Sequence, residues 1–215
     1  MLPASQKDRW LDRWIPTIRA RTPNGPIFEI GCGTGWDTKI LNDAGFSVVA
    51  IDADESALKK ARHLVQEAQF HHQDMTKGLR IGSTRFAVIL GSLSMHYFNW
   101  NTTVDLISQV NSGLASGGLF LFRVNSTKDK HYGSTGHPEI ESHFYMVEKK
   151  PKRFFDRSDI KRLFSSGWKI LNMEEQKIDR YDQPKWVWEV ILELTPTHPA
   201  YHKRRHEFAL ISCSL

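Results

Sequence analysis

The chain has 215 residues, of which 40% are hydrophobic and 25% are charged, and its formal net charge is +5 at pH 7. This length fits one large domain with an appendage better than two full domains, and the composition is that of an ordinary globular protein. The longest run of aliphatic or aromatic residues, 86–90, is too short to cross a membrane, and the first ten residues lack the apolar core of a signal peptide. Two cysteines cannot build a disulfide framework. We therefore exclude fibrous, disulfide-rich, secreted and membrane-spanning classes and expect a cytoplasmic protein.

The positive charge is concentrated in two stretches, residues 149–153 and 202–206. The ordinary reading of such a stretch is a solvated surface, and the alternative is contact with phosphate or nucleic acid. Neither an RNA-binding module with stacked aromatic residues nor a DNA-reading helix accompanies these stretches. Nucleic acid is therefore a possible partner but not the favoured one.

The predicted elements begin with an amphipathic helix over residues 5–15. Pro16 ends or kinks this helix and can open a further turn through Ile18. The turn-forming stretch 22–26 separates this N-terminal helical cap, residues 1–25, from the rest of the chain. Alternating strands and helices follow, and this order indicates βαβ units in a mostly parallel sheet. The predicted strands are 27–30, 46–51, 69–72, 86–90 and 119–124, and the predicted helices are 36–44, 54–66 and 102–114.

The remainder departs from this alternation. Residues 125–157 show no clear periodicity, and a connection of this length is usually functional, so we expect it to cover an acceptor site. A helix over 158–164 and two strands, 168–174 and 186–194, follow, and a turn between the strands predicts an antiparallel hairpin. We predict an α/β fold, a Rossmann-like three-layer sandwich with a mostly parallel seven-stranded sheet. It spans residues 26–194 and precedes a basic C-terminal tail, 195–215.

The most informative motif is EIGCGTG, residues 29–35, between the first strand and the first helix. Its alternating glycines permit a sharp turn and let a ligand approach the backbone, and the free N–H groups of the next helix suit a carboxylate or phosphate. Asp52 ends the second strand, 21 residues beyond Gly31, where a carboxylate can accept both hydroxyls of a ribose. A helix cap is the alternative role for Asp52, although Asp54 is better placed for it.

These residues resemble a class I S-adenosylmethionine-dependent methyltransferase. The resemblance rests on EIGCGTG, the strand-end Asp52, the pair Asp74-Met75 after the third strand, and Gly91-Ser92-Leu93 after the fourth. It covers about residues 26–194 and points to the small-molecule branch, which includes tellurite-resistance-like and ubiquinone-biosynthesis-like methylases. It implies S-adenosyl-L-methionine as cofactor, S-adenosyl-L-homocysteine as product, and a small-molecule methyl acceptor as partner.

The resemblance also implies which residues hold the cofactor. Glu29 would anchor the glycine loop, Asp52 would hold the ribose and Ala53 would pack on the adenine. Asp74 and Met75 would contact the adenine edge, although a turn former and a core filler are their ordinary roles. The remaining implied cofactor-binding residues are Gly31, Cys32, Gly33, Gly35, Trp36, Gly91 and Ser92. Among these we expect the cysteine to be a small apolar filler rather than a nucleophile, because no neighbouring base is evident.

A nicotinamide dinucleotide is the rival ligand for such a loop. Its fingerprint requires glycine at position 36 for close packing of helix on strand. This chain carries Trp36, whose indole blocks that packing and suits a ligand without a pyrophosphate. The sequence therefore favours S-adenosylmethionine over NAD.

The methyl acceptor is expected beyond the carboxyl ends of the fourth and fifth strands. A sulfonium methyl is already activated, so the protein mainly has to align the acceptor and exclude water. His96 is the candidate general base, and ordering of the cofactor loop is its equal alternative. Tyr97 is expected to form a wall of the pocket. Arg123 and Asn125 could orient an anionic or carbonyl-bearing acceptor, and a structural ion pair is the alternative for Arg123.

His137, Glu139, Glu141 and His143 alternate, so an extended chain would place them on one side, where they could hold a divalent metal. The residues between them are equally consistent with an ordinary lid strand, and we expect no metal. Two other functions on the same fold stay open: an RNA methyltransferase or RNA-binding protein, and a non-catalytic cofactor-binding protein. The sequence defines neither the acceptor atom nor an oligomeric state.

Overall fold

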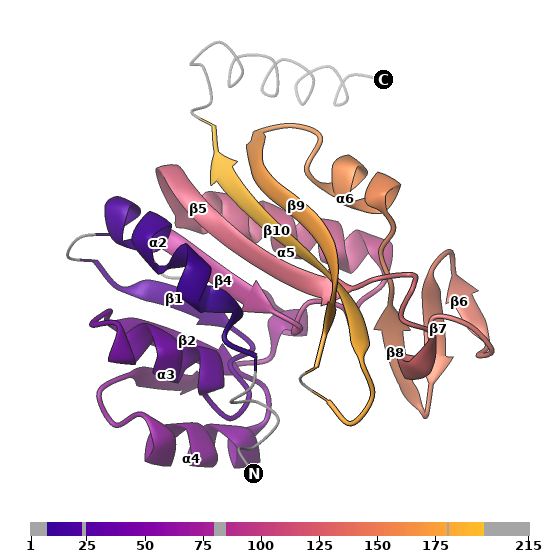
Figure 1. Cartoon of the computed structure of the whole chain (residues 1–215), viewed down its shortest axis with the longest axis horizontal. Helices are drawn as coiled ribbons and strands as arrows, with labels where there is room; N and C mark the ends of the chain where they lie inside the picture. The colour runs from indigo at the N-terminus through magenta and orange to yellow at the C-terminus, as the bar shows by residue number, and fades with distance from the viewer. Residues whose placement is uncertain (1–7, 23–24, 80–84, 180, 196–215) are drawn as a thin grey trace, which may run out of the picture.

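The structure is a computed structural model that describes residues 8–22, 25–79, 85–179 and 181–195 (Figure 1). Its main sheet contains β1 (Ile27–Ile30), β2 (Val48–Asp52), β3 (Gln69–His72), β4 (Phe86–Ser92), β5 (Leu114–Asn125), β9 (Trp168–Ile178) and β10 (Lys185–Leu194). The strands lie in the order β3-β2-β1-β4-β5-β10-β9. The first five strands pair in parallel, whereas β10 is antiparallel to both β5 and β9. The predicted Rossmann-like sheet with its terminal antiparallel hairpin is thus confirmed.

Helices cover both faces of this sheet (Figure 1). One face carries α2 (Ile15–Arg21), α3 (Trp36–Asp43) and α4 (Glu55–Leu64), and the other carries α5 (Trp100–Gly113) and α6 (Arg157–Leu163). Two separate buried clusters hold the layers together, one around Ile18, Leu41 and Leu58, the other around Leu106 and Ile160. Each such side chain contributes about 1.5–3 kcal/mol when fully buried. The arrangement leaves the carboxyl ends of β1, β2 and β4 at one common edge, where loops can build a site.

The N-terminal helix differs from the prediction. A short 3₁₀ helix, η1 (Trp10–Trp14), replaces the predicted helix and leads directly into α2, and Pro16 lies in the first turn of α2, which is the further turn that it was predicted to open. Proline suits that position because the first N–H groups of a helix need no partner within it and because its φ is already helical. The predicted helix began at residue 5, and its first residues, 5–7, lie outside the described residues.

The connection after β5 was expected to be irregular, and this expectation was wrong. It contains a short 3₁₀ helix, η3 (Lys130–Tyr132), and a second sheet of β6 (Glu139–Glu141), β7 (Phe144–Val147) and β8 (Lys150–Arg153). This three-stranded antiparallel sheet projects beside the main sheet (Figure 1). Its strands are only three or four residues long, too short for a recognisable alternation. Its turns place His143, Glu148 and Lys149 at positive φ, without the Asn-Gly or Asp-Gly signals that predict such turns.

One strand boundary also differs from the prediction. β5 starts at Leu114, five residues before the predicted strand, and its register against β4 shifts between Phe86 and Val88. None of the helices in the described part of the chain is long and apolar enough to cross a membrane. Most of the predicted basic tail, 196–215, lies outside the described residues, as does the basic stretch within it.

Candidate active site

The loop between β1 and α3 requires its glycines. Gly31, Gly33 and Gly35 have φ values of +72°, +55° and +84°, in the left-handed region that other residues rarely adopt. A Cβ atom on Gly31 would lie 2.2 Å from the Cβ of Ser94, and one on Gly35 would lie 3.0 Å from the Cβ of Ala61. A Cβ on Gly33, by contrast, would meet no atom of the described residues within 4 Å. The first and last glycines therefore permit close packing, and the middle one leaves space for a ligand.

Asp52 joins the end of β2 to this loop. Its Oδ2 accepts a hydrogen bond from the Gly33 amide at 2.7 Å, and its Oδ1 accepts one from the Asp54 amide at 2.8 Å. The helix cap of α4 is Asp54, whose side chain accepts hydrogen bonds from the amides of Ser56 and Ala57. The capping alternative for Asp52 is therefore wrong, and a carboxylate with further lone pairs stands beside the open glycine.

Glu29 and Cys32 flank the same turn. Glu29 is buried and accepts a hydrogen bond from Thr38 Oγ1 at 2.5 Å. This bond connects β1 to the first turn of α3. Cys32 is also buried, and burial together with the negative charge of Glu29 raises the pKa of its thiol well above the ordinary value. The thiol stays protonated at neutral pH, as expected for a small apolar filler rather than a nucleophile.

A cavity of about 500 Å³ opens over the glycine loop. It is lined by Gly31, Gly33, Asp52, Ala53, Asp54, Asp74, Met75, Leu93, Ser94, Tyr97 and Phe98. The structure thus brings the predicted cofactor residues from the ends of β1, β2 and β3 together. Glu29, Cys32, Gly35, Trp36, Gly91 and Ser92 are not among the lining residues. A Cβ on Gly91 would lie 3.1 Å from the sulfur of Met95, so this glycine faces the core rather than the cavity.

Asp74 has two roles in the structure. It begins a short 3₁₀ helix, η2 (Met75–Lys77), by accepting hydrogen bonds from the Thr76 amide at 2.9 Å and the Thr76 hydroxyl at 2.7 Å. These hydrogen bonds lower the pKa of the Asp74 carboxyl, which stays ionised. The residue is therefore the turn former that its type suggests, and it also lines the cavity.

The loop after β4 supplies a wall of the cavity, and its first residue, Leu93, belongs to the Gly91-Ser92-Leu93 motif on which the resemblance rests. Ser94 is buried, and its hydroxyl donates a hydrogen bond to the Ile30 carbonyl at 2.6 Å. The preceding residue, Leu93, takes a left-handed φ of +54°, which is unusual for leucine and turns the chain across the glycine loop. The sequence did not indicate the contact of Ser94 with the glycine loop.

His96 lies beyond this wall, on the acceptor side. It is 4% exposed, and its Nδ1 has no hydrogen-bond partner within the described part of the chain. Burial, and to a smaller degree the positive charges of Lys185 and Lys152, lower the pKa of this imidazole well below 6.5. Its ring centroid is 4.3 Å from that of Tyr97, which itself lines the cavity. A neutral imidazole, able to accept a proton, therefore stands one residue away from the cavity.

A buried ion pair that the sequence did not suggest lies near His96. Lys185 Nζ is 2.6 Å from Asp129 Oδ2, and both side chains are almost fully buried. The same Nζ is 4.6 Å from the ring centroid of Tyr132. Burial lowers the pKa of Lys185, and the partner Asp129 opposes this shift. The pair fixes the start of β10 against the connection that follows β5.

Arg123 and Asn125 are both completely buried at the end of β5. Arg123 Nη1 donates to Asp8 Oδ2 at 2.9 Å, so the alternative of an ion pair to a nearby acid is observed. The guanidinium also lies 4.6 Å from the ring centroid of Trp10. The Asn125 amide donates a 3.4 Å hydrogen bond to the Arg153 carbonyl, while its Oδ1 has no partner among the described residues.

The four alternating residues considered for a metal do not converge. Glu141 forms an ion pair with Arg153 and accepts a hydrogen bond from the Trp100 amide at 2.5 Å. Glu139 accepts a hydrogen bond from the His143 backbone amide. The strand β6 ends at Glu141, so the extended geometry that the metal hypothesis needs does not continue to His143.

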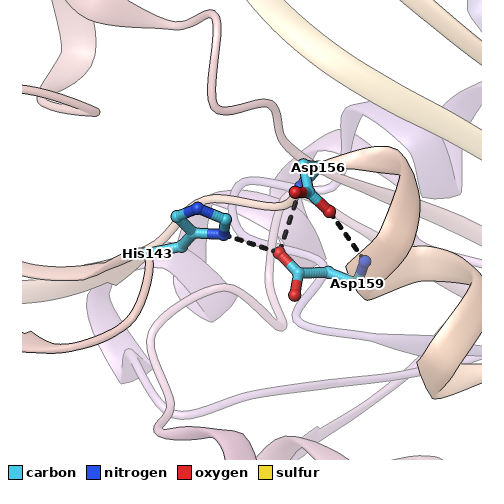
Figure 2. Close-up of side chains that lie close together, drawn as sticks. All are labelled: His143, Asp156 and Asp159. Atoms are coloured by element: carbon cyan, nitrogen blue, oxygen red, sulfur yellow. Dashed lines mark hydrogen bonds and ion pairs between the residues drawn. The ribbon is translucent and has the colours of Figure 1, made fainter.

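His143 instead lies beside two aspartates at the start of α6, the capping residue Asp156 and Asp159 of the first turn (Figure 2). Its Nδ1 is 2.8 Å from Asp159 Oδ2, and potential ligand atoms of His143, Asp156 and Asp159 lie within 4.8 Å of one another. The two aspartates form a reciprocal cap, in which each side chain accepts the backbone N–H of the other. Helix capping and one His–Asp contact account for this cluster, which anchors the small sheet to α6.

The match to known families covers the first half of this fold. Residues 27–118, from the start of β1 to the glycines of β5, match the family described as "Methyltransferase domain". The matched region is similar to this family over somewhat less than half of the chain. The loop, the strand-end aspartate and the cavity described above all depend on residues within or next to the matched region.

Curated relatives carry the same description. A Bacillus subtilis protein, YqeM, provisionally described as a methyltransferase, is 31% identical over 121 residues, which are 54% of this chain and 49% of the relative. The trans-aconitate 2-methyltransferase of Sinorhizobium fredii is 26% identical over 136 residues, 62% of this chain and 47% of that protein. The matched regions thus span about half of each relative's own length.

Solved structures extend the similarity to the whole fold. A SAM-dependent methyltransferase from Methanosarcina mazei superposes with a TM-score of 0.70 at 16% identity, covering 80% of this chain and 93% of the other. Magnesium protoporphyrin IX methyltransferase from Synechocystis, solved with bound SAM, has a TM-score of 0.61 at 14% identity, covering 89% and 80%. At these identities the likeness concerns the fold, which is that of class I methyltransferases.

Proposed function

We propose that this chain transfers the methyl group of S-adenosylmethionine to a small-molecule acceptor and releases S-adenosylhomocysteine. The observation that carries the proposal is the cavity over the glycine loop, in which Asp52 stands beside the open backbone of Gly33. The similarity of residues 27–118 to the methyltransferase family and the likeness of the fold to class I methyltransferases support the same reaction.

The residues around the cavity fit this cofactor. The Asp52 side chain would accept hydrogen bonds from the ribose hydroxyls, and the lining residues Ala53, Met75 and Phe98 offer apolar surface for the adenine. Asp74, held ionised by its hydrogen bonds to Thr76, would accept from the exocyclic amine of the adenine. When bound, the cofactor supplies a methyl group on a sulfonium, which is activated for direct displacement. The chain itself has to bind, orient and exclude water.

On the side where the methyl acceptor would bind, we propose His96 as the group that takes a proton and Tyr97 as a wall of the site. His96 is neutral at physiological pH, so it can accept a hydrogen bond and, during the reaction, a proton from an acceptor hydroxyl or amine, although the burial that keeps it neutral also makes it a weak base. Tyr97 lines the cavity between the cofactor residues and His96. Burial raises the pKa of its phenol, which keeps it protonated. Asn125 Oδ1, buried and without a partner in the described chain, is a further acceptor contact in this proposal.

The small-molecule branch of the family remains part of the proposal. One relative is named for trans-aconitate, a small molecule, which is consistent with that branch. The small sheet β6–β8 lies beside His96, because the backbone amide of Arg153 at the end of β8 donates a hydrogen bond to the His96 carbonyl at 2.7 Å. We assign this sheet as the cover of the acceptor site. A cytoplasmic location is also part of the proposal, because two cysteines cannot build a disulfide framework.

The experiment is a methyl-transfer screen with purified protein, which reads S-adenosylhomocysteine formation over a panel of small metabolites, with an RNA mixture as a separate arm. The proposal predicts turnover with one class of small molecule and none with RNA. Turnover with RNA alone would overturn the assignment of the acceptor. Binding of the cofactor without turnover on any substrate class would favour the non-catalytic alternative.

A further inference from the structure

Two buried side chains with unpartnered polar atoms are joined by the backbone of β8. His96 is 4% exposed and Asn125 is completely buried, yet His96 Nδ1 and Asn125 Oδ1 have no hydrogen-bond partner among the described residues. The Arg153 backbone connects them, because its amide donates to the His96 carbonyl at 2.7 Å and its carbonyl accepts from the Asn125 amide at 3.4 Å. Tyr97, which follows His96, lines the cofactor cavity. Because buried polar atoms without partners are rare and usually contact a ligand or water, this place suits the methyl acceptor.

The charges around these two residues do not balance. Lys152 of β8 is half-buried and has no ion-pair partner in the part of the chain that the structure describes. Lys185 lies on the same face of the main sheet as Asn125, because Val187, two residues along β10, is the register partner of Asn125. Lys185 pairs with Asp129 at 2.6 Å. The two lysines and this one aspartate leave a single positive charge.

Both lysines act on the space beside His96. Their positive charges contribute to the lowered pKa of the imidazole, and the charge of Lys152 also lowers the pKa of Lys185. Like charges at such range repel each other, and this repulsion destabilises the fold unless an anion offsets it. A protonated amine that entered this place would be repelled as well, whereas a carboxylate or phosphate would be attracted. The electrostatics therefore favour a negatively charged ligand.

Lys152 is the cation that remains for such a ligand. Successive residues of a strand point to opposite faces, so Arg153 faces away from Lys152. The Arg153 guanidinium pairs with Glu141 and donates to the Phe98 carbonyl. Glu139 of the same small sheet is exposed, and its carboxylate accepts a backbone amide within its own hairpin. An ammonium has three hydrogens to donate, so Lys152 can bind one or two oxygens of an anionic group.

We propose that the methyl acceptor carries an anionic group, a carboxylate or a phosphate, and that Lys152 binds this group while His96 and Asn125 contact the remainder of the acceptor. The inference rests on the proposed function and adds the class of substrate to it. It assigns the anion to the small sheet rather than to Arg123, whose guanidinium is already in an ion pair. It also gives a binding role to one lysine of the basic stretch 149–153.

The test uses pairs of compounds that differ in charge. Carboxylic acids are compared with their primary amides, and phosphate monoesters with their parent alcohols, as acceptors for the wild-type chain with S-adenosylmethionine. The rate of S-adenosylhomocysteine formation gives kcat and KM for each compound. One anionic class should have a kcat/KM at least about tenfold above that of its uncharged counterparts, because the counterparts lack a charge-assisted contact. The class that is turned over distinguishes a carboxylate from a phosphate.

Variants of β8 separate the charge of Lys152 from the fold. Lys152→Gln should raise KM for the anionic acceptor by roughly 10- to 100-fold, while kcat stays within about threefold and S-adenosylhomocysteine affinity within about twofold. Lys152→Arg keeps the charge and should raise KM less. Lys150→Gln removes the same charge from an exposed position of the strand and should change KM by less than about twofold. Thermal unfolding identifies any variant that fails to fold, and Lys152→Met, which keeps most of the aliphatic stem, then replaces Lys152→Gln.

The inference is overturned if the wild type prefers the uncharged compounds, or if Lys152→Gln and Lys150→Gln change KM equally. It is also overturned if Lys152→Arg raises KM as much as Lys152→Gln, because the charge would then not be what binds the acceptor. In each of these cases the proposed function stands, since a small molecule is still methylated. A chain that methylates none of the compounds would instead contradict the proposed function itself, so the two failures are distinguishable.

Discussion

Gly31 and Ser94 are packed so closely that a Cβ atom on Gly31 would lie 2.2 Å from the Cβ atom of Ser94. The contact joins the loop after β1 to the loop after β4, and the Ser94 hydroxyl reinforces it by donating to the Ile30 carbonyl. The floor of the cavity is thus formed by two loops whose contacting residues, Gly31 and Ser94, are 63 residues apart in the sequence.

The first prediction separates packing from ligand space within one loop. Gly31→Ala should lower the free energy of unfolding by about 2–5 kcal/mol, because it adds both a left-handed alanine and a steric overlap. Gly33→Ala should lower it by only about 1–2 kcal/mol, since a Cβ there meets no described atom, but should abolish cofactor binding. Urea unfolding and titration with S-adenosylhomocysteine measure the two effects. Equal stability of the two variants would contradict this division of roles.

The second prediction concerns two neighbouring aspartates. Asp52→Ala should weaken S-adenosylhomocysteine binding by about 1.5–3 kcal/mol, because charged hydrogen bonds to the ribose are lost. Asp54→Ala removes the cap of α4 and should lower the free energy of unfolding by about 1 kcal/mol with a smaller effect on affinity. Calorimetry and thermal unfolding on both variants give the comparison. Unchanged affinity in Asp52→Ala would leave Asp52 only its hydrogen bonds to the loop.

The sequence predicts the main sheet well for physical reasons. Buried parallel strands are rich in aliphatic and β-branched residues, and this composition makes the strands at 48–51 and 86–90 recognisable. The glycines of the first loop are recognisable because the loop needs backbone angles that few other residues can adopt. The site contacts that it misses link distant positions without any local signature. Arg123 meets Asp8 across 115 residues, and Lys185 meets Asp129 across 56. The small sheet was missed because its strands are too short to show a period.

The third prediction is a pH dependence of stability at His96. Burial lowers the pKa of the folded imidazole well below 6.5, so below pH 6.5 the unfolded chain binds a proton that the folded chain does not. The free energy of unfolding should therefore fall as the pH is lowered from about 7.5 to about 5.5, by at most about 1.4 kcal/mol per pH unit. His96→Gln should lack this contribution. Urea unfolding of the wild type and of the variant at several pH values measures this pH dependence. If the free energy of unfolding changes with pH in the same way for both proteins, burial does not lower the pKa of His96 in the folded chain.

The fourth prediction tests the small sheet as a cover of the acceptor site. β6 and β7 form an antiparallel hairpin, so a flexible glycine–serine linker in place of residues 137–148 removes both strands. This variant should keep its S-adenosylhomocysteine affinity within about threefold, because the cavity residues lie elsewhere. It should lose turnover on the substrate found in the screen. A folded variant with normal turnover would show that β6 and β7 do not cover the acceptor.

The central claim is that the cavity beside Asp52 and Gly33 binds S-adenosylmethionine. Its most direct test is calorimetric titration of the wild-type chain with S-adenosylhomocysteine and, separately, with NAD. We predict saturable binding of S-adenosylhomocysteine at one site per chain and no heat change with NAD, because Trp36 stands where a dinucleotide fold needs glycine. Tight binding of NAD together with no response to S-adenosylhomocysteine would contradict the account.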